Sequence, residues 1–290
     1  MKIKLSISLL LIITMLSLFA SCSKSEDTST TVLKMVFVPA SEKGDDNDFV
    51  SLINIIEKLT GYKIESIKVT DYNAAVEAMR AGRATMAWFG AKTYIQAAEM
   101  AGAEAFAVGV PKGKKTASYN THFIVKKGSP ITAFTKEQLK GTKLALNHVG
   151  STSGDLIPRY ELLQIDMDTK NADNFEIVQY AGSHDAAIMS VLYQTADVGG
   201  VSSVNWDARI LDGTINPDDF TIIHSSPPIM GAPLAYSNSL PLKVRQAVKK
   251  AVLDAHNHGS IGGYGGEMDH YEGVVDADYD ITRSIAKTVK

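Results

Sequence analysis

The sequence predicts an α/β fold in which two lobes face each other across a ligand cleft and are joined by two crossing strands. Short β-rich apolar runs alternate with stretches of helical period over the first ninety folded residues, and the alternation restarts near residue 121. Such alternation is typical of parallel or mixed sheets covered by helices. The units connect near residue 120 and again near residue 230, as expected when one domain is inserted into another, and paired crossings form a hinge beside a cleft.

The first lobe is expected to contain residues 32–120 and 232–290. Its strands are short apolar runs, and its helices are stretches in which apolar residues recur every three to four positions. Asp and Asn residues offer N-terminal caps, and glycines follow several expected helix ends. The expected strands are 32–39, 64–69, 85–89, 106–109 and 234–237, and the expected helices are 48–60, 71–81, 93–100, 241–255 and 279–289.

The second lobe is expected to contain residues 121–231. Its expected strands are 122–125, 143–146, 176–180, 198–201 and 220–224, and its expected helices are 135–139, 156–163 and 184–193. The glycine-rich segment 259–266, back in the first lobe, does not follow an expected strand. We therefore interpret that segment as a flexible loop rather than a phosphate-binding loop.

The N-terminal segment predicts export. Two lysines precede an apolar run, residues 5–20, that is short for a membrane-spanning helix and ends in small residues, so residues 1–21 are interpreted as a signal peptide. Cys22, the only cysteine, follows directly, and its position resembles the bacterial lipobox, in which the cysteine is lipidated. Residues 22–31 then form a polar, flexible tether. The chain is expected outside the cytoplasmic membrane and anchored to it by lipid; the alternative is a plain secretory signal with an incidental cysteine.

Charge and histidine spacing exclude two classes of ligand. The formal net charge is −3, from 29 basic and 32 acidic residues, so no strongly basic field exists and nucleic acid is not an expected partner. The histidines show no metal-ligand spacing beyond His256 and His258, which lie in a polar segment. We expect no metal, and any bound anion must be held by local donors.

The most informative segment is residues 147–155, with the sequence Asn-His-Val-Gly-Ser-Thr-Ser-Gly-Asp. A strand ends there, three hydroxyl residues follow (Ser151, Thr152 and Ser153), and a helix begins. The N–H groups at a helix start lack partners and carry partial positive charge, which makes an anion site. Hydroxyls add donors without adding charge. The alternative is that these residues only cap the helix.

Three other polar side chains follow expected strands and open helices. His184 lies in the first turn of its helix, where an imidazole can donate to an anion. Tyr72 and Tyr94 are placed in the first turns of two first-lobe helices, at the carboxyl ends of strands, where α/β sheets bind ligands. Taken singly, each of the three is equally compatible with ordinary packing.

Together these motifs resemble a known family. The chain contains, in order, Tyr72-Asn-Ala-Ala-Val-Glu-Ala-Met-Arg-Ala-Gly, Trp88-Phe-Gly-Ala-Lys-Thr-Tyr94, Gly150-Ser-Thr-Ser-Gly154, Gly182-Ser-His-Asp-Ala-Ala-Ile188 and Ala196-Asp-Val198. Across residues 32–255 this order and spacing is similar to that of the phosphate-, phosphite- and phosphonate-binding proteins of ABC importers. The motifs are individually weak, and their ordered combination is specific.

The resemblance implies a type II periplasmic-binding-protein fold and a monomer that delivers a small oxyanion to a membrane permease, with no cofactor and no catalysis. It implies that the second lobe holds the oxyanion through Ser151, Thr152, Ser153 and His184. It also implies that Tyr72 and Tyr94 close on the ligand from the first lobe.

One departure from the family narrows the expected ligand. Family members that bind aminophosphonates carry carboxylates for the ammonium group, but residues 200–206 and 228–233 contain none, and Asp207 is the nearest candidate. An unpaired ammonium in a closed cleft is costly. We therefore expect phosphite, methylphosphonate or a related phosphonate without an amine. Trp88 or a tyrosine is the candidate apolar wall against the fourth oxygen of phosphate.

Two other functions remain open from the residues alone. A ligand-binding sensor has the same sequence features as a transport component. A hydrolase is the less favoured alternative, because Ser, His and Asp are present but no G-x-S-x-G nucleophile elbow accompanies them.

Overall fold

The computed structural model describes residues 32–42 and 45–289, which belong to one compact unit. The predicted signal peptide, Cys22 and the tether lie outside the described residues. Within the described part of the chain, no helix is long and apolar enough to cross a membrane.

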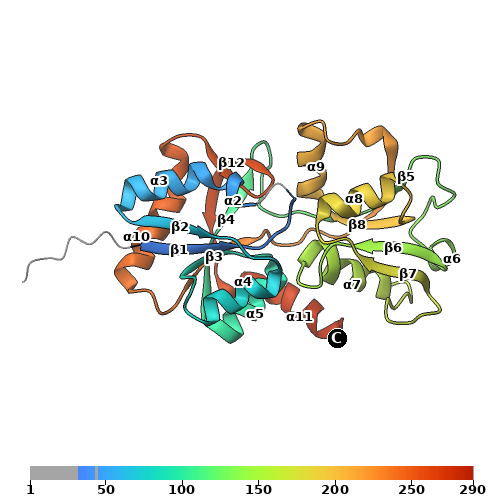
Figure 1. The fold of residues 1–290 in the computed structure, drawn as a ribbon, viewed down its shortest axis with the longest axis horizontal. Coiled ribbons are helices and arrows are strands. Elements are labelled where there is room, and N and C mark those ends of the chain that lie inside the picture. The colour runs from blue at the N-terminus through green and yellow to red at the C-terminus, as the bar shows by residue number, and fades with distance from the viewer. Residues whose placement is uncertain (1–31, 43–44, 290) are drawn as a thin grey trace, which may run out of the picture. The chain divides into compact units, whose positions relative to one another are not determined.

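The first sheet has seven strands in the order β11-β12-β4-β10-β3-β1-β2 (Figure 1). Strand β1 pairs in parallel with β2 and β3, whereas β10 is antiparallel to β3 and β4. The sheet is therefore mixed. The strands are β1 Val32–Phe37, β2 Lys63–Ile67, β3 Met86–Trp88, β4 Ala103–Pro111, β10 Pro233–Ser237, β11 Ile261–Gly263 and β12 Gly266–Gly273.

Helices α3 and α10 pack together on one side of this sheet, and α4 and α5 pack together on the other. One continuous apolar core fills the space between the sheet and these helices. The helical elements are α2 Asp45–Asp48, α3 Val50–Thr60, α4 Tyr72–Arg80, α5 Ala91–Ala101, α10 Leu242–Leu253, η3 Ala255–Asn257, η4 Asp276–Tyr279 and α11 Asp280–Thr288.

The second sheet has five strands in the order β7-β6-β8-β5-β9. Its two faces bury separate cores, because alternate residues of a strand point to opposite faces: Phe123 and Val125 enter one core and Ile124 the other. The strands are β5 Thr121–Lys126, β6 Thr142–Leu146, β7 Phe175–Tyr180, β8 Val198–Ser202 and β9 Phe220–Ser225. The helical elements are α6 Lys136–Leu139, η1 Thr152–Leu156, α7 Ile157–Leu163, α8 His184–Leu192, α9 Ser203–Leu211 and η2 Pro217–Asp219.

Two segments connect the sheets, one between β4 and β5 and the other between β9 and β10. They pair through an antiparallel bridge in which Tyr119 and Ile229 exchange backbone hydrogen bonds of 3.0 and 2.8 Å. The structure is therefore an α/β fold of two lobes with a two-strand connection, which is the fold class that the sequence predicts.

Two elements differ from the sequence-based expectation. Helix α9 was not predicted, although Ser202 caps it through a hydrogen bond from the N–H of Val204. The glycine-rich segment predicted as a flexible loop instead forms the β11–β12 hairpin, which pairs with β4. Its glycines permit close packing: a Cβ on Gly262 would lie 2.0 Å from the carbonyl oxygen of Asp48.

This packing predicts a stability difference between two glycines of one hairpin. Gly262→Ala is expected to lower the free energy of unfolding by about 1–3 kcal/mol, because the added methyl group overpacks against backbone. Gly273→Ala is the matched control, because a Cβ there meets no atom within 4 Å; it should stay within about 1 kcal/mol of the wild type. Urea unfolding of both variants measures the difference, and equal stabilities would contradict the described packing.

Candidate functional site

The candidate site lies between the end of strand β6 and the start of the helical segment that follows it. Ser151 is the N-cap of η1, and its Oγ accepts a hydrogen bond of 3.0 Å from the N–H of Gly154. The π-type turn η1 runs directly into α7, so that residues 152–163 form one helical segment. Single π turns are frequent at functional sites.

Thr152 and Ser153 supply uncharged donors at this helix start. Their N–H groups lie in the first turn, where intrahelical acceptors are lacking and the helix dipole is positive. Each residue is only 2% exposed. Thr152 Oγ1 accepts a hydrogen bond of 2.9 Å from the N–H of Lys92 in the first lobe, so its own O–H remains available to donate.

Helix α8 places His184 against the same helix start, where it is 1% exposed. The N–H of Ser202 donates to His184 Nδ1 at 3.1 Å. Because a backbone N–H can only donate, Nδ1 carries no proton and the neutral ring holds its proton on Nε2. That Nε2 atom lies 3.5 Å from Ser153 Oγ.

Burial keeps His184 uncharged, since it lowers the pKa of the imidazole from 6.5 to about 3. The ring is therefore a neutral donor at physiological pH. A glycine at position 154 allows this approach, because a Cβ there would lie 2.9 Å from His184 Cε1 and 2.3 Å from Asn147 Cβ. The tight packing around Gly154 thus holds the imidazole beside Ser153.

Tyr119 adds a phenol from the first connecting segment. Its hydroxyl interacts with the hydroxyls of Ser153 and Thr152. Burial raises the pKa of Tyr119 to about 12, and the contacts with Ser153 and Thr152 only partly oppose this rise. The phenol therefore stays protonated and is a further neutral donor.

Tyr72 is the first residue of α4 and reaches the second lobe. Its hydroxyl accepts a hydrogen bond of 3.3 Å from Asn147 Nδ2. Its ring stacks on His148, with centroids 5.0 Å apart and planes tilted by 16°. Tyr72 is 2% exposed, so its phenol meets the donors of the second lobe in a desolvated environment.

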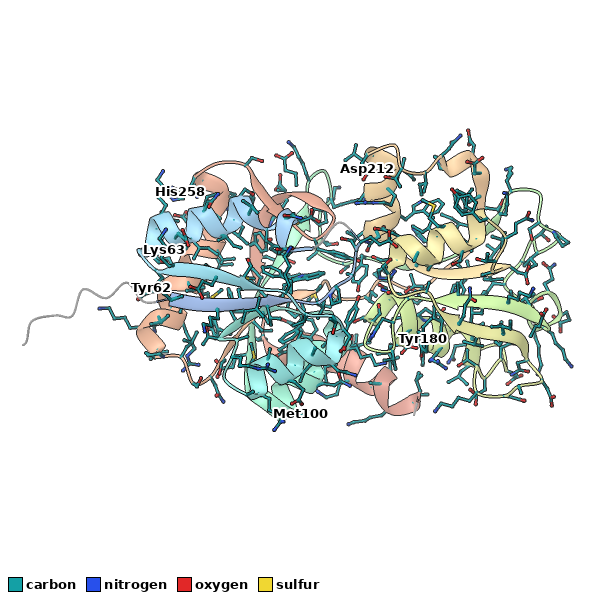
Figure 2. All side chains as sticks on the ribbon, in the orientation of Figure 1. Tyr62, Lys63, Met100, Tyr180, Asp212 and His258 are labelled. Carbon is teal, nitrogen blue, oxygen red and sulfur yellow. The ribbon has the colours of Figure 1, made fainter. Side chains whose placement is uncertain are left out.

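The charged groups beside the helix start pair with one another. The Asp155 carboxylate, 2% exposed, lies 2.7 Å from Lys92 Nζ and 2.7 Å from Arg159 Nε. The hydroxyl of Tyr180, a residue labelled in Figure 2, also donates to Asp155 at 2.7 Å. Two cations therefore surround one carboxylate, and none of the three side chains lines the cavity described below.

Tyr72, Tyr119 and residues 151–153 help to enclose a small cavity between the two lobes. Its free space is about 10 Å³, on the scale of about one water molecule, so any ligand of several heavy atoms requires the walls to move. The described residues that line it include no charged side chain. They are Val38, Ala40, Tyr72, Trp88, Gly90, Tyr119, Ser151, Thr152, Ser153, Ala232 and Tyr264.

The structure does not bring Tyr94 to this cavity. Helix α5 begins at Ala91, two residues before its predicted start, and each residue turns the helix by about 100°, so Tyr94 is its fourth residue and faces inward. Its hydroxyl donates to Asp276 at 2.7 Å, and its ring packs against Tyr279. The phenol of Tyr94 is therefore occupied within the first lobe.

Of the two weaker candidates, Trp88 lies at the cavity and Asp207 does not. Trp88 lines the cavity as an apolar wall and packs against Tyr264, with ring centroids 4.8 Å apart. Asp207 does not line the cavity, and its carboxylate lies 3.1 Å from Lys114 Nζ in an exposed ion pair. His184 is adjacent to the cavity through Ser153.

Three contributing residues were not singled out from the sequence. Asn147 was visible as the polar residue that ends a strand in the most informative segment. Tyr119 lies on a connecting segment, and Tyr264 lies in the turn of the β11–β12 hairpin. Neither tyrosine has a periodic or motif signal, because the two lobes bring them to the cavity only in the folded chain.

The candidate site contains no metal-binding arrangement. Across residues 32–42 and 45–289, no group of three or more His, Cys, Asp or Glu side chains is placed to hold a metal ion. The chemistry that these residues support is hydrogen bonding to an anion.

Comparison with known proteins gives a family and a fold. Residues 35–279 match the family described as the periplasmic substrate-binding proteins of phosphonate ABC transporters. The chain is 26% identical over 247 residues to the phosphate-import protein PhnD of Mycolicibacterium smegmatis. This alignment covers 80% of this chain and 76% of that protein.

Solved structures that share the fold include two from phosphonate-type binding proteins. A binding protein component of an ABC phosphonate transporter from Pseudomonas aeruginosa has a TM-score of 0.77 and 19% identity, covering 90% of this chain and 87% of that one. PhnD1 from Prochlorococcus marinus (MIT 9301), in complex with methylphosphonate, has a TM-score of 0.76 and 18% identity, covering 89% of this chain and 98% of that one. The fold is that of type II periplasmic binding proteins, as predicted.

The environment of His184 predicts a pH dependence of stability. The folded-state pKa lies near 3, whereas the ordinary pKa of an imidazole is 6.5, so the unfolded chain alone gains a proton as the pH falls below about 6.5. Stability from this residue is complete above that pH and is lost on acidification, by about 2 kcal/mol between pH 6.5 and 5. Urea unfolding at both pH values should show a smaller loss for His184→Gln than for the wild type. Equal losses would mean that His184 is not held neutral.

Proposed function

The chain belongs to the family of periplasmic phosphonate-binding proteins of ABC transporters, as the sequence motifs indicated, and from this membership we propose that it captures a small phosphorus oxyanion and delivers it to a membrane permease. The family consists of substrate-binding proteins, so the chain is a binding protein rather than an enzyme and acts outside the cytoplasm. The observation that supports the ligand class best is the convergence of uncharged donors on the start of η1.

The donors suit a tetrahedral oxyanion, which clusters several acceptors on one atom. The N–H groups of Thr152 and Ser153, their two hydroxyls and the phenols of Tyr72 and Tyr119 line one small space, and the Nε2–H of His184 adjoins it. Hydrogen bonds to a charged acceptor are roughly twice as strong as neutral ones. Neutral donors therefore bind a desolvated anion without a buried countercharge, which would carry its own desolvation cost.

The absence of a carboxylate among the described lining residues favours a ligand without an amine. Asp207, the nearest candidate by sequence, pairs with Lys114 instead. A ligand ammonium would thus be buried without a partner, which is costly. We infer phosphite, methylphosphonate or a similarly small phosphonate, and the methylphosphonate complex of the Prochlorococcus protein supports this choice.

Trp88 is proposed as the wall that disfavours phosphate. It is 2% exposed and presents an aromatic surface to the cavity. A phosphonate or phosphite directs one P–C or P–H bond at such a surface, whereas phosphate must bury a fourth oxygen there. A buried acceptor without a donor costs about 1–3 kcal/mol.

Cys22 is proposed as the lipid anchor that keeps the protein close to its permease. The proposal is based on the position of Cys22, which follows the apolar run 5–20 and Ser21 and precedes a polar segment. A tethered binding protein stays near its transporter at high effective concentration.

Substitutions that each remove one hydroxyl group test the site. Tyr72→Phe and Ser153→Ala each remove one donor and should weaken binding of phosphite or methylphosphonate about tenfold, as for a lost hydrogen bond to a charged group. Tyr94→Phe is the matched control: it also removes a buried hydroxyl, but one bonded to Asp276, so its affinity should equal that of the wild type. Isothermal titration calorimetry measures all three variants. A loss confined to Tyr94→Phe would reverse the assignment.

Titration with 2-aminoethylphosphonate tests the ligand class. It should bind the wild type at least about tenfold more weakly than methylphosphonate, because its ammonium lacks a carboxylate partner. Tighter binding of the aminophosphonate would refute the proposed ligand.

Lipid attachment has its own test in cells. Metabolic labelling with a fatty-acid analogue should mark the wild type and leave Cys22→Ser unlabelled and released from the membrane fraction. Equal membrane retention of both proteins would refute the anchor and leave the ligand site unaffected.

A further inference from the structure

Tyr264 lies between the oxyanion cavity and a second, larger pocket. It lines the small cavity together with Ser151, Thr152 and Ser153. It also lines a pocket of about 410 Å³ between the β11–β12 hairpin and helix α9, which is within the size range of small-molecule sites. Among the residues around these spaces, only Tyr119 and Tyr264 line both.

Several contacts fix the ring of Tyr264 in this position. It packs against Trp88 at a centroid distance of 4.8 Å and meets the edge of Tyr119 at 6.4 Å. Its hydroxyl is within hydrogen-bond distance of Ser202 Oγ, at 3.0 Å, and of Asn205 Oδ1. A first-lobe aromatic ring is thus held across the opening by the second lobe.

We propose, on the basis of the proposed function, that Tyr264 is a specificity-determining residue whose ring limits the length of the organic substituent of the bound phosphonate. With the ring in place, the cavity is closed toward the larger pocket, so a longer substituent meets the ring. Without it, the cavity opens into the larger pocket, and the phosphorus end can stay on the η1 donors while the substituent extends outward.

Of the two shared residues, Tyr264 rather than Tyr119 is the one that acts as a removable wall. Tyr119 belongs to the connection between the lobes through its bridge with Ile229, and its hydroxyl contacts Ser153 and Thr152. Tyr264 is half-buried and occupies a two-residue turn between paired Gly263 and Gly266. Its side chain can therefore be shortened without removing an oxyanion donor.

The larger pocket has the chemistry to accept an alkyl chain. Val204, Ala208, Leu211 and Met268 give it apolar lining. The charges at its rim are already paired, Lys112 with Glu267 at 2.8 Å and Lys114 with Asp207 at 3.1 Å. An uncharged alkyl substituent thus fits it without breaking an ion pair.

Calorimetric titration of methylphosphonate and n-propylphosphonate tests this inference. The wild type should favour methylphosphonate by at least about tenfold, as expected for chain atoms that do not fit. Tyr264→Ala should reduce that preference by about tenfold or more. Tyr264→Leu, with intermediate volume, should reduce it less, and it serves as the second variant if the alanine protein does not fold.

Tyr264→Phe is the matched control, because it keeps the ring and removes only the hydroxyl contacts to Ser202 and Asn205. It should keep the wild-type preference even if both ligands bind more weakly. An unchanged preference in Tyr264→Ala, with equal weakening of both ligands, would overturn the inference and leave Tyr264 as a contact between lobes. A wild type that binds n-propylphosphonate as tightly as methylphosphonate would overturn it too. Failure of the wild type to bind any phosphorus oxyanion would instead refute the proposed function itself, and the inference with it.

Discussion

The hydrogen bond from the N–H of Ser202 to Nδ1 of His184 determines which protons face the candidate cavity. It fixes the proton of the neutral ring on Nε2, beside Ser153 Oγ, and burial prevents a second proton from binding. When Ser153 accepts from Nε2, its own O–H can donate onward, toward Tyr119 or a ligand. One backbone contact in β8 thus orients a chain of uncharged donors, and a site without a cation in its wall can still attract an anion.

The residues that are proposed to hold the ligand also join the two lobes. Thr152 accepts from the N–H of Lys92, and the carbonyl oxygen of Gly150 accepts from the Thr93 hydroxyl at 2.9 Å. Asn147 bonds to Tyr72 across the same boundary. Ligand binding and contact between lobes therefore depend on the same short segment, residues 147–152.

The sequence predicts the parts of the site that lie at strand ends. Ser151, Thr152, Ser153 and Tyr72 follow strands and open helices, and that local rule is sufficient to place them at the cavity, with His184 beside it. The same rule failed for Tyr94, because a helix start shifted by two residues turns the side chain to another face.

Local sequence patterns do not predict the position of residues that reach the cavity only through long-range folding. Tyr119 and Tyr264 reach the cavity from a connecting segment and from a hairpin turn. The glycines around Tyr264 were interpreted as a flexible loop, whereas Gly262 packs against Asp48. Helix α9 is not predicted because residues 200–206, which contain its first turn, are interpreted from the sequence as cleft lining.

A crystal structure of the protein with methylphosphonate measures the central claim directly. The account predicts phosphonate oxygens within about 2.7–3.2 Å of the N–H groups of Thr152 and Ser153 and of Oγ of Ser153, with the methyl group toward Trp88. A phosphonate held instead by lysine or arginine side chains, away from the start of η1, would contradict it.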